Sequence, residues 1–272
     1  MNLLARIVAE KQKEVAVGKA RGVESPAARS GELGGRKRRV DVVQALRRLA
    51  GEPLRLLAEV KFKSPSAGDL SRTLDAPSRA VAYAEGGARL VSILCDQTFF
   101  GGSFNDLWAA RQALDAKGLL VPLLAKEFII DPVQLDWAVG HGADAVLIIA
   151  RILRPDQVRG LANEARERGL EPLIEVTTEG ECEVALESGA RIVGVNARDL
   201  DTLAIDSTRT ARVLRAIPPD RVAIHFSGVR SPEDVRVIAA GRADAALVGE
   251  ALMREDNPAP FLRNLVSAAR QA

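Results

Sequence analysis

The chain has 272 residues, of which 47% are hydrophobic and 27% are charged, and its formal net charge is +2. This length allows one large domain or two small ones, and the composition is that of an ordinary globular protein. A charge so close to zero creates no field that would attract nucleic acid or a membrane surface, so we expect neither as a partner. No apolar run approaches a membrane span and the N-terminus lacks a signal-like apolar segment, so we expect a cytoplasmic protein.

Two cysteines and one basic run are the remaining compositional signals. Cys95 and Cys182 are far apart and lack the paired spacing of a zinc site or a disulfide framework, which fits a reducing compartment. The basic run Arg36–Arg39 lies in a stretch rich in Gly, Ser and Arg, residues 19–39. We interpret this stretch as a solvated loop, with attraction of a phosphate or of nucleic acid as the alternative.

Apolar periodicity divides the chain into helical and strand segments. Residues 2–18 place Leu3, Leu4 and Ile7 near helical spacing, which predicts an amphipathic first helix, and a second short helix is predicted over 42–49. From residue 56 onward, short apolar runs alternate with amphipathic stretches. The eight apolar runs are 56–61, 90–94, 121–125, 145–150, 172–176, 191–195, 222–226 and 243–248.

This alternation predicts the fold. Nearly continuous apolar strands separated by helices are typical of a parallel sheet covered on both faces. Before every second run stands a Gly-Ala or Gly-Arg-Ala sequence, where glycine would cap the preceding helix in the left-handed conformation. These sequences are at 87–88, 142–143, 189–190 and 241–243. Their regular steps favour a closed (βα)8 TIM barrel over an open doubly wound sheet, which stays the alternative. We expect one domain, with a helical extension (1–50) before the barrel (56–272).

Polar residues recur where the predicted strands end. Alternation along the first strand places Glu59 and Lys61 on one face, although an exposed ion pair would explain those two residues alone. Five further runs also end in polar or small residues, and the active site of such barrels lies at this end. The residues are Lys126, Glu175, Asn196, Ser227 with Gly228, and Gly249 with Glu250. The sequence therefore predicts a polar pocket at the C-terminal ends of the strands.

The last two loops predict a phosphate site. In such barrels the loops after the seventh and eighth strands commonly bind phosphate through backbone N–H groups. Gly228, Gly249 and Glu250 lie in these loops, and Ser64 reaches in from the first loop. Each glycine alone is better explained as a turn residue, and only their joint placement favours a site. The lysines, glutamates and amide nearby suit an anionic substrate that undergoes proton transfers.

Several local motifs carry a family resemblance. They are Glu59-x-Lys61-x-Lys63-Ser64-Pro65-Ser66, Phe99-Phe100-Gly101-Gly102-Ser103, Lys126-Glu127-Phe128, Leu173-Ile174-Glu175-Val176, Asn196-x-Arg198-Asp199-Leu200-x-Thr202 and Leu252-Met253-Arg254. With Ile7-Val8-x-x-Lys11-x-x-Glu14-Val15 near the start, the similarity extends over almost the whole chain. In these motifs the sequence resembles indole-3-glycerol phosphate synthase, a family of tryptophan biosynthesis.

The resemblance implies a reaction and a set of roles. The reaction is ring closure of 1-(2-carboxyphenylamino)-1-deoxyribulose 5-phosphate with loss of carbon dioxide and water, catalysed by a carboxy-lyase without a metal or organic cofactor. Lys126 would be the general acid of ring closure, and Lys61 would hold the substrate carboxylate and act in dehydration. Glu175 and Glu59 would remove protons, and Asn196 would orient the substrate.

The substrate contacts implied by the same resemblance are Ser64, Phe100, Phe128, Arg198 and Ser227. We expect a monomer that binds a small sugar phosphate. Two alternatives remain open from the residues. A strand-end lysine could form a Schiff base, as in an aldolase-like lyase. The barrel could also bind a phosphorylated ligand without turnover.

The chain departs from this family at the seventh apolar run. The family reads Ala-Glu-Ser-Gly there, whereas residues 225–228 read His-Phe-Ser-Gly. Alternation directs Phe226 into the pocket and His225 to the other face. An aromatic ring then stands where the family has a carboxylate. We expect the lost charge to lower the lysine pKa values and to make the synthase slow or shift it toward another substrate.

Overall fold

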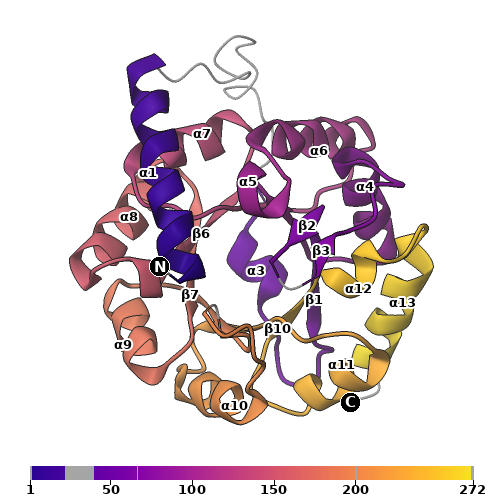
Figure 1. Ribbon diagram of the computed structural model, residues 1–272. Helices are drawn as coiled ribbons and strands as arrows, with labels where there is room; N and C mark the ends of the chain where they lie inside the picture. Colours follow the sequence, from indigo (N-terminus) through magenta and orange to yellow (C-terminus); the bar gives the residue numbers. More distant parts are fainter. Residues whose placement is uncertain (1, 22–39, 66, 200, 271–272) are drawn as a thin grey trace.

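The computed structural model describes residues 2–21, 40–65, 67–199 and 201–270. Within them, eight parallel strands close into a barrel in the order β1-β10-β9-β8-β7-β6-β5-β4, surrounded by helices (Figure 1). The strands are β1 (Arg55–Val60), β4 (Leu90–Leu94), β5 (Leu123–Lys126), β6 (Ala145–Ile149), β7 (Glu171–Val176), β8 (Ile192–Asn196), β9 (Val222–Phe226) and β10 (Ala245–Val248). The predicted TIM barrel is confirmed, and the open sheet is excluded because β4 pairs with β1.

A helix or helical turn follows each strand. The longer helices are α4 (Ala76–Gly86), α6 (Phe104–Ala116), α7 (Pro132–Gly140), α8 (Pro155–Glu167), α9 (Glu179–Glu187), α10 (Ser207–Ala216), α11 (Pro232–Ala239) and α13 (Pro258–Ala269). The short helices are α5 (Gln97–Phe100), η2 (Ala150–Ile152) and α12 (Glu250–Met253). Between β1 and α4, β2 (Lys63–Ser64) pairs with β3 (Gly68–Asp69) as an antiparallel hairpin. Side-chain caps such as Asp75, Ser103 and Asp131 satisfy free N–H groups and so set where several helices begin.

The predicted glycine caps are right at three positions and wrong at the fourth. Gly87, Gly142 and Gly189 have φ values of 99°, 81° and 74°, the left-handed conformation that glycine adopts without steric cost. Gly241 does not adopt it, because α11 ends earlier and its cap, Ala240, is right-handed. The regular spacing of the four sequences therefore marks the repeat correctly even though one glycine has a different conformation.

Strand alternation produces two cores. The barrel interior is filled by residues such as Leu57, Leu124, Leu173 and Ile224, and the layer between strands and helices by their neighbours along each strand, such as Ala58. This period of two follows from the pleat of a strand. It directs the residue two positions after the last interior hydrophobic side chain toward the C-terminal mouth of the barrel, as for Glu59 after Leu57 and Lys126 after Leu124.

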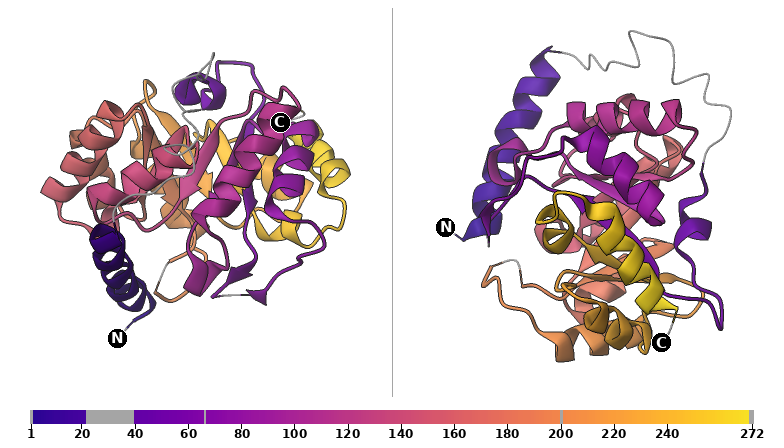
Figure 2. Two further views of the ribbon diagram at one scale, coloured as in Figure 1. Left: turned by 90° about the horizontal axis from the view of Figure 1, so that it is seen from above. Right: turned by 90° about the vertical axis from the view of Figure 1, so that its right-hand side faces the viewer.

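The N-terminal extension covers both ends of the barrel. Figure 2 shows α1 (Leu3–Arg21) at the end where the hairpin β2–β3 lies and α3 (Val42–Leu46) at the opposite end. The second helix is shorter than predicted, because Arg47 is already extended. The predicted loop also starts too early, since residues 19–21 continue α1. The basic run Arg36–Arg39 lies outside the described residues.

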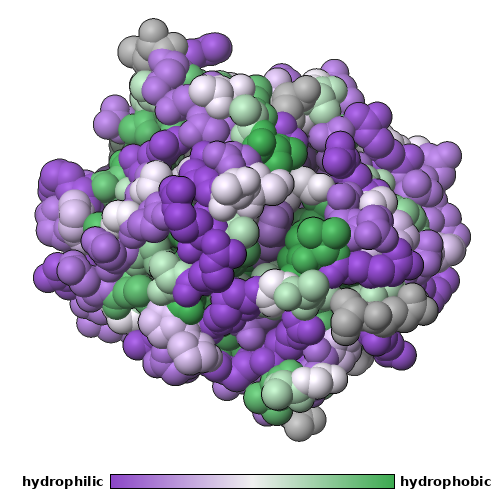
Figure 3. Space-filling view, turned by 90° about the horizontal axis from the view of Figure 1, so that it is seen from below, coloured by the Kyte–Doolittle hydropathy of each residue, from purple (hydrophilic) through white to green (hydrophobic). Residues whose placement is uncertain are grey.

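Exposed hydrophobic side chains are scattered over the surface. In the view of Figure 3 hydrophilic residues predominate, and hydrophobic ones form separated groups. Among the described residues the exposed large hydrophobic side chains are Val17, Leu49, Leu120, Ile205 and Val237, which belong to different elements. No helix in the described ranges combines the length and apolar composition that a membrane span requires. Cys95 and Cys182 are both buried and unbonded to each other.

Candidate active site

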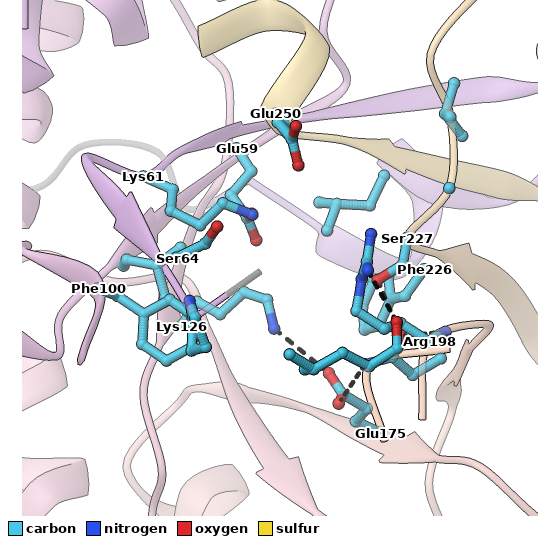
Figure 4. A pocket seen from close by; sticks show the side chains of 18 of the residues that line it. Glu59, Lys61, Ser64, Phe100, Lys126, Glu175, Arg198, Phe226, Ser227 and Glu250 are labelled. Atoms are coloured by element: carbon cyan, nitrogen blue, oxygen red, sulfur yellow. Dashed lines mark hydrogen bonds and ion pairs between the residues drawn. The ribbon is translucent and has the colours of Figure 1, made fainter. Parts of the chain in front are cut away.

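A pocket of about 740 Å³ opens at the C-terminal ends of the strands. It brings together every residue that the sequence placed in the site, drawn from the strand ends and the loops that follow them (Figure 4). These residues are Glu59, Lys61, Ser64, Phe100, Lys126, Phe128, Glu175, Asn196, Arg198, Ser227, Gly228, Gly249 and Glu250. Phe226 also lines the pocket.

The first charged pair comes from the end of β1. Lys61 Nζ lies 2.8 Å from Glu59 Oε1, and the lysine side chain is 16% exposed whereas the glutamate is only 4% exposed. The carboxylate therefore lies behind the ammonium, which faces the pocket. Burial raises the pKa of Glu59, but the charges of Lys61 and Lys126 outweigh burial and hold that pKa below its ordinary value. Glu59 is an anion at neutral pH.

A second chain of contacts crosses three strands. Lys126 Nζ at the end of β5 donates to Glu175 Oε2 on β7 at 3.3 Å. Asn196 Nδ2 on β8 donates to Glu175 Oε1 at 3.0 Å, and Ser227 Oγ donates to Asn196 Oδ1 at 2.8 Å. The dashed lines in Figure 4 trace part of this chain. Both oxygens of Glu175 are thus occupied, which fixes the carboxylate relative to Lys126.

Two opposing effects set the pKa of Lys126, and the lowering expected relative to a site with a carboxylate at residue 226 stays a prediction. Burial does lower its pKa, but the charges of Glu175 and Glu59 outweigh burial, so the pKa lies above its ordinary value. The two lysines do not face each other as an isolated pair of like charges, because each has its own glutamate. Two carboxylates remain near Lys126 even though Phe226 supplies none, and they keep the ammonium protonated.

Aromatic rings form another part of the lining. The rings of Phe100, at the end of α5, and Phe128, in the segment after β5, are 5.8 Å apart between centroids. Phe226, at the end of β9, is 1% exposed and points into the pocket as alternation predicted. His225 lies on the other face of the strand, where burial lowers its pKa to about 4, so its ring is neutral.

The loops predicted to hold phosphate adopt unusual backbone conformations. Ser227 and Gly228 have successive positive φ values of 69° and 86°. Gly249 packs so closely on Glu59 that an added Cβ would lie 2.7 Å from Oε1. The carboxylate of Glu250 is engaged by Arg254 at 2.7 Å, an ion pair that holds its pKa below the ordinary value. Glu250 can therefore bind an anion through its backbone N–H group but not through its side chain.

Comparison with known proteins identifies this arrangement. A model of the indole-3-glycerol phosphate synthase family matches residues 4–265. The chain belongs to this family. It is 42% identical over 219 residues to the indole-3-glycerol phosphate synthase of Arthrobacter sp. (strain FB24), covering 80% of this chain and 79% of that one. With the synthase of Mycobacterium sp. (strain KMS) it shares 41% identity over 230 residues, covering 84% and 81%.

The third relative is much longer than this chain. The "Multifunctional tryptophan biosynthesis protein" of Schizosaccharomyces pombe is 40% identical over 212 residues, which are 78% of this chain and 28% of that protein. Among solved structures, the alpha subunit of tryptophan synthase from Legionella pneumophila superposes with a TM-score of 0.63 at 14% identity, covering 86% of this chain and 100% of that one. Thiamine phosphate pyrophosphorylase from Pyrococcus furiosus gives 0.60 at 13% identity, covering 80% and 96%. Identities this low show the fold alone.

The sequence did not predict that α1 of this synthase-family chain forms part of the pocket. Leu3, Leu4 and Ile7 line the pocket from that helix. One turn farther along, Lys11 is 1% exposed, with its Nζ 2.8 Å from Asp96 Oδ2 and 3.2 Å from Glu127 Oε1. The apolar stripe of α1 could be read from the sequence, but the pocket that this stripe lines could not.

The same acids hold the aromatic rings of the pocket. Asp96 accepts hydrogen bonds from the backbone N–H groups of Phe99 and Phe100 at 2.6 and 3.0 Å. Glu127 Oε1 accepts from the N–H of Phe128 at 2.7 Å. Asp96 is a typical N-cap, so its contact with α5 was readable from the sequence. Its contact with Lys11 was not.

Proposed function

We propose that this protein catalyses ring closure of 1-(2-carboxyphenylamino)-1-deoxyribulose 5-phosphate to indole-3-glycerol phosphate. The observation that carries the proposal is the pocket with two lysine–glutamate pairs at the strand ends, in a chain of the synthase family. Each pair combines an ammonium exposed to the pocket with a carboxylate buried behind it. Such pairs suit a reaction in which protons are both delivered and removed.

Lys126 is the proton donor of the first step. A carbon–carbon bond forms between the ring carbon that carries the carboxylate and the keto carbon of the sugar, and the keto oxygen takes a proton from the ammonium. Because the pKa of Lys126 lies above its ordinary value, the donor is fully protonated at neutral pH. Carbon dioxide then leaves, and its bonding electrons restore the aromatic ring. Glu175, 3.3 Å from Lys126, orients the donor.

Lys61 and Glu59 act in binding the substrate carboxylate and in dehydration. The Lys61 ammonium faces the pocket and binds the carboxylate until it leaves as carbon dioxide. In dehydration a lysine protonates the departing hydroxyl, while a glutamate removes the proton whose loss forms the double bond. Asn196 lies between Glu175 and Ser227 and orients the substrate through those contacts. That these steps need no metal or organic cofactor is part of the proposal.

The remaining contacts bind the substrate. Phe100, Phe128 and Arg198 line the aromatic end, and Ser64, Gly228 and Gly249 hold the phosphate with the backbone of Glu250. A phosphorylated sugar with an aromatic carboxylate carries the negative charges that the two lysines offset. That the protein acts as a cytoplasmic monomer is a further part of the proposal.

Incubation with the proposed substrate, followed by the fluorescence of the indole product, tests this function. We expect turnover by the purified protein. Binding of the substrate without turnover would favour a ligand-binding barrel instead. Borohydride treatment in the presence of a keto-sugar phosphate separates the lyase alternative, because the proposed reaction leaves no covalent adduct on a lysine.

A further inference from the structure

The ring of Phe226 lies next to the lysine proposed as the acid. Lys126 Nζ is 5.4 Å from the centroid of this ring, within the range of a cation–π contact. The ring is 1% exposed, so little water competes for the ammonium on that side. Figure 4 shows Phe226 across the pocket from Glu59 and Lys61, in the part of the site where Lys126 meets Glu175.

A glycine on the neighbouring strand makes room for this ring. A Cβ added to Gly194 would lie 2.5 Å from Cε2 of Phe226 and 2.9 Å from Cζ, closer than atoms can approach without moving. Gly194 is in register with Glu175 on β7, and Phe226 is in register with Asn196 on β8. The ring therefore packs over β8 beside the carboxylate that also holds Lys126. The absence of a side chain at residue 194 is what permits this position.

We infer that Phe226 is a positioning residue for Lys126, whose ammonium is held by the ring together with the Glu175 carboxylate. The ring attracts the cation through its quadrupole but accepts no proton from it. Holding the ammonium from a second direction restricts the long lysine side chain, which otherwise has many rotamers to lose in the transition state. The inference rests on the proposed function for its role in catalysis, but the contact itself does not.

Other charged groups near Lys126 also affect its pKa. They are Glu175 on β7 and Glu59 on β1, with Lys61 paired to Glu59. A change at residue 226 leaves all of them in place. Removing the aromatic face should therefore lower the pKa of Lys126 without removing either carboxylate.

Phe226→Leu tests the inference, because leucine keeps an apolar side chain but has no aromatic face. We expect kcat to fall about tenfold and KM to change by less than about threefold, the pattern for an interaction used in the transition state. In protein labelled with ¹³C at the lysine ε carbon, the Lys126 signal, assigned by its absence in Lys126→Ala, should titrate at a lower pH in this variant than in the parent. Phe226→Tyr keeps the aromatic face and should stay within about threefold of the parent in kcat.

Two further variants separate positioning from packing. Gly194→Ala leaves Phe226 in place but displaces its ring, and should reproduce the fall in kcat and the lower Lys126 pKa. Phe104→Leu removes a ring that packs on Trp137 and His141 and does not line the pocket, so it should change neither quantity. If Phe226→Leu does not fold, Gly194→Ala and Phe226→Tyr decide by the same measurements.

An unchanged Lys126 titration in Phe226→Leu and Gly194→Ala would overturn the inference. A loss of kcat in Phe104→Leu as large as in Phe226→Leu would overturn it too, by showing a general packing effect. If the parent protein has no synthase activity but the Lys126 titration moves as expected, the contact stands and the proposed function fails. The two conclusions are thus tested separately.

Discussion

At the scale of single residues, Lys126 is the side chain whose loss should affect chemistry most. We predict that Lys126→Ala lowers kcat by ~10² or more, the usual consequence of removing a positioned general acid. Circular dichroism and steady-state kinetics on the proposed substrate measure the effect. Lys117→Ala is the control, because Lys117 is 55% exposed on its side chain, outside the pocket. Activity close to the parental value in a folded Lys126→Ala variant would refute the assignment.

Phe226 stands where the sequence analysis expects a family carboxylate, and introducing a carboxylate there gives a second prediction. In Phe226→Glu we expect kcat/KM to rise by ~10-fold or more, about 1.4 kcal/mol of transition-state stabilisation. A carboxylate would give Lys126 and the substrate an ion-paired acceptor, which holds a cation more firmly than an aromatic ring does. The centroid of the Phe226 ring is 5.4 Å from Lys126 Nζ, so a carboxylate at this position would face the ammonium. The pKa of Lys126 is already above its ordinary value with Phe226 in place.

Phe226→Gln is the matched control, because it has the shape of glutamate without the charge. Replacing a buried phenyl ring also costs stability, so thermal unfolding must show that both variants are folded under the assay conditions. An unchanged or lower kcat/KM in folded Phe226→Glu would mean that the site has been rebuilt around the ring. The interpretation of this departure should then be abandoned.

At the scale of elements, the loops after β9 and β10 are expected to bind the phosphate group. We predict that inorganic phosphate inhibits competitively and that a crystal grown in sulfate holds an ion near Ser64, Gly228 and Gly249. In Gly228→Ala, where φ is 86°, an added methyl group strains the loop, and the inhibition constant for phosphate should rise ~10-fold. Gly118→Ala is a control with comparable strain, since Gly118 has φ of 67°, does not line the pocket and has no atom within 4 Å of an added Cβ. An empty cleft in sulfate, together with non-competitive behaviour, would contradict this prediction.

At the scale of the whole molecule, the contact between α1 and the barrel should make stability depend on pH. Burial raises the pKa of Glu127 to about 7, partly offset by Lys11, while Asp96 adds to the rise. The folded protein then holds a proton on Glu127 between its ordinary pKa of 4.5 and about 7, whereas the unfolded chain has released it. The stabilisation is fully present below the lower pKa and is lost as pH rises through about 7.

We therefore expect the free energy of unfolding to be lower at pH 8.5 than at pH 5.5, by on the order of 2 kcal/mol from this group. Glu127→Gln should flatten this difference, because the amide does not titrate. Glu167→Gln, at an exposed position on α8, should leave it unchanged. Urea unfolding at several pH values measures all three proteins, and an equally steep pH dependence in Glu127→Gln would show that other groups cause it.

The sequence by itself determined the barrel and the membership of its pocket. Apolar runs such as 90–94 and 222–226 became strands at those bounds, because a strand buried on both faces must be apolar throughout. Closing parallel strands into a barrel brings all their C-terminal ends to one mouth, so Lys126 and Glu175 had to lie near each other whatever their separation in the chain. These features follow from local patterns and from one topological rule, and both are readable in a sequence.

Only the tertiary structure decided which partners meet inside that frame. Lys11 and Glu127 are 116 residues apart, and nothing in the pattern of α1 distinguishes a buried lysine from a solvated one until the helix is docked. Likewise Gly194 reads as an ordinary strand glycine, and its role appears only when the ring of Phe226 is seen to occupy the space over it. Even the direction of the Lys126 pKa depended on two glutamates from other strands. Ion pairing and side-chain packing depend on distances of a few ångströms between distant segments, which periodicity does not encode.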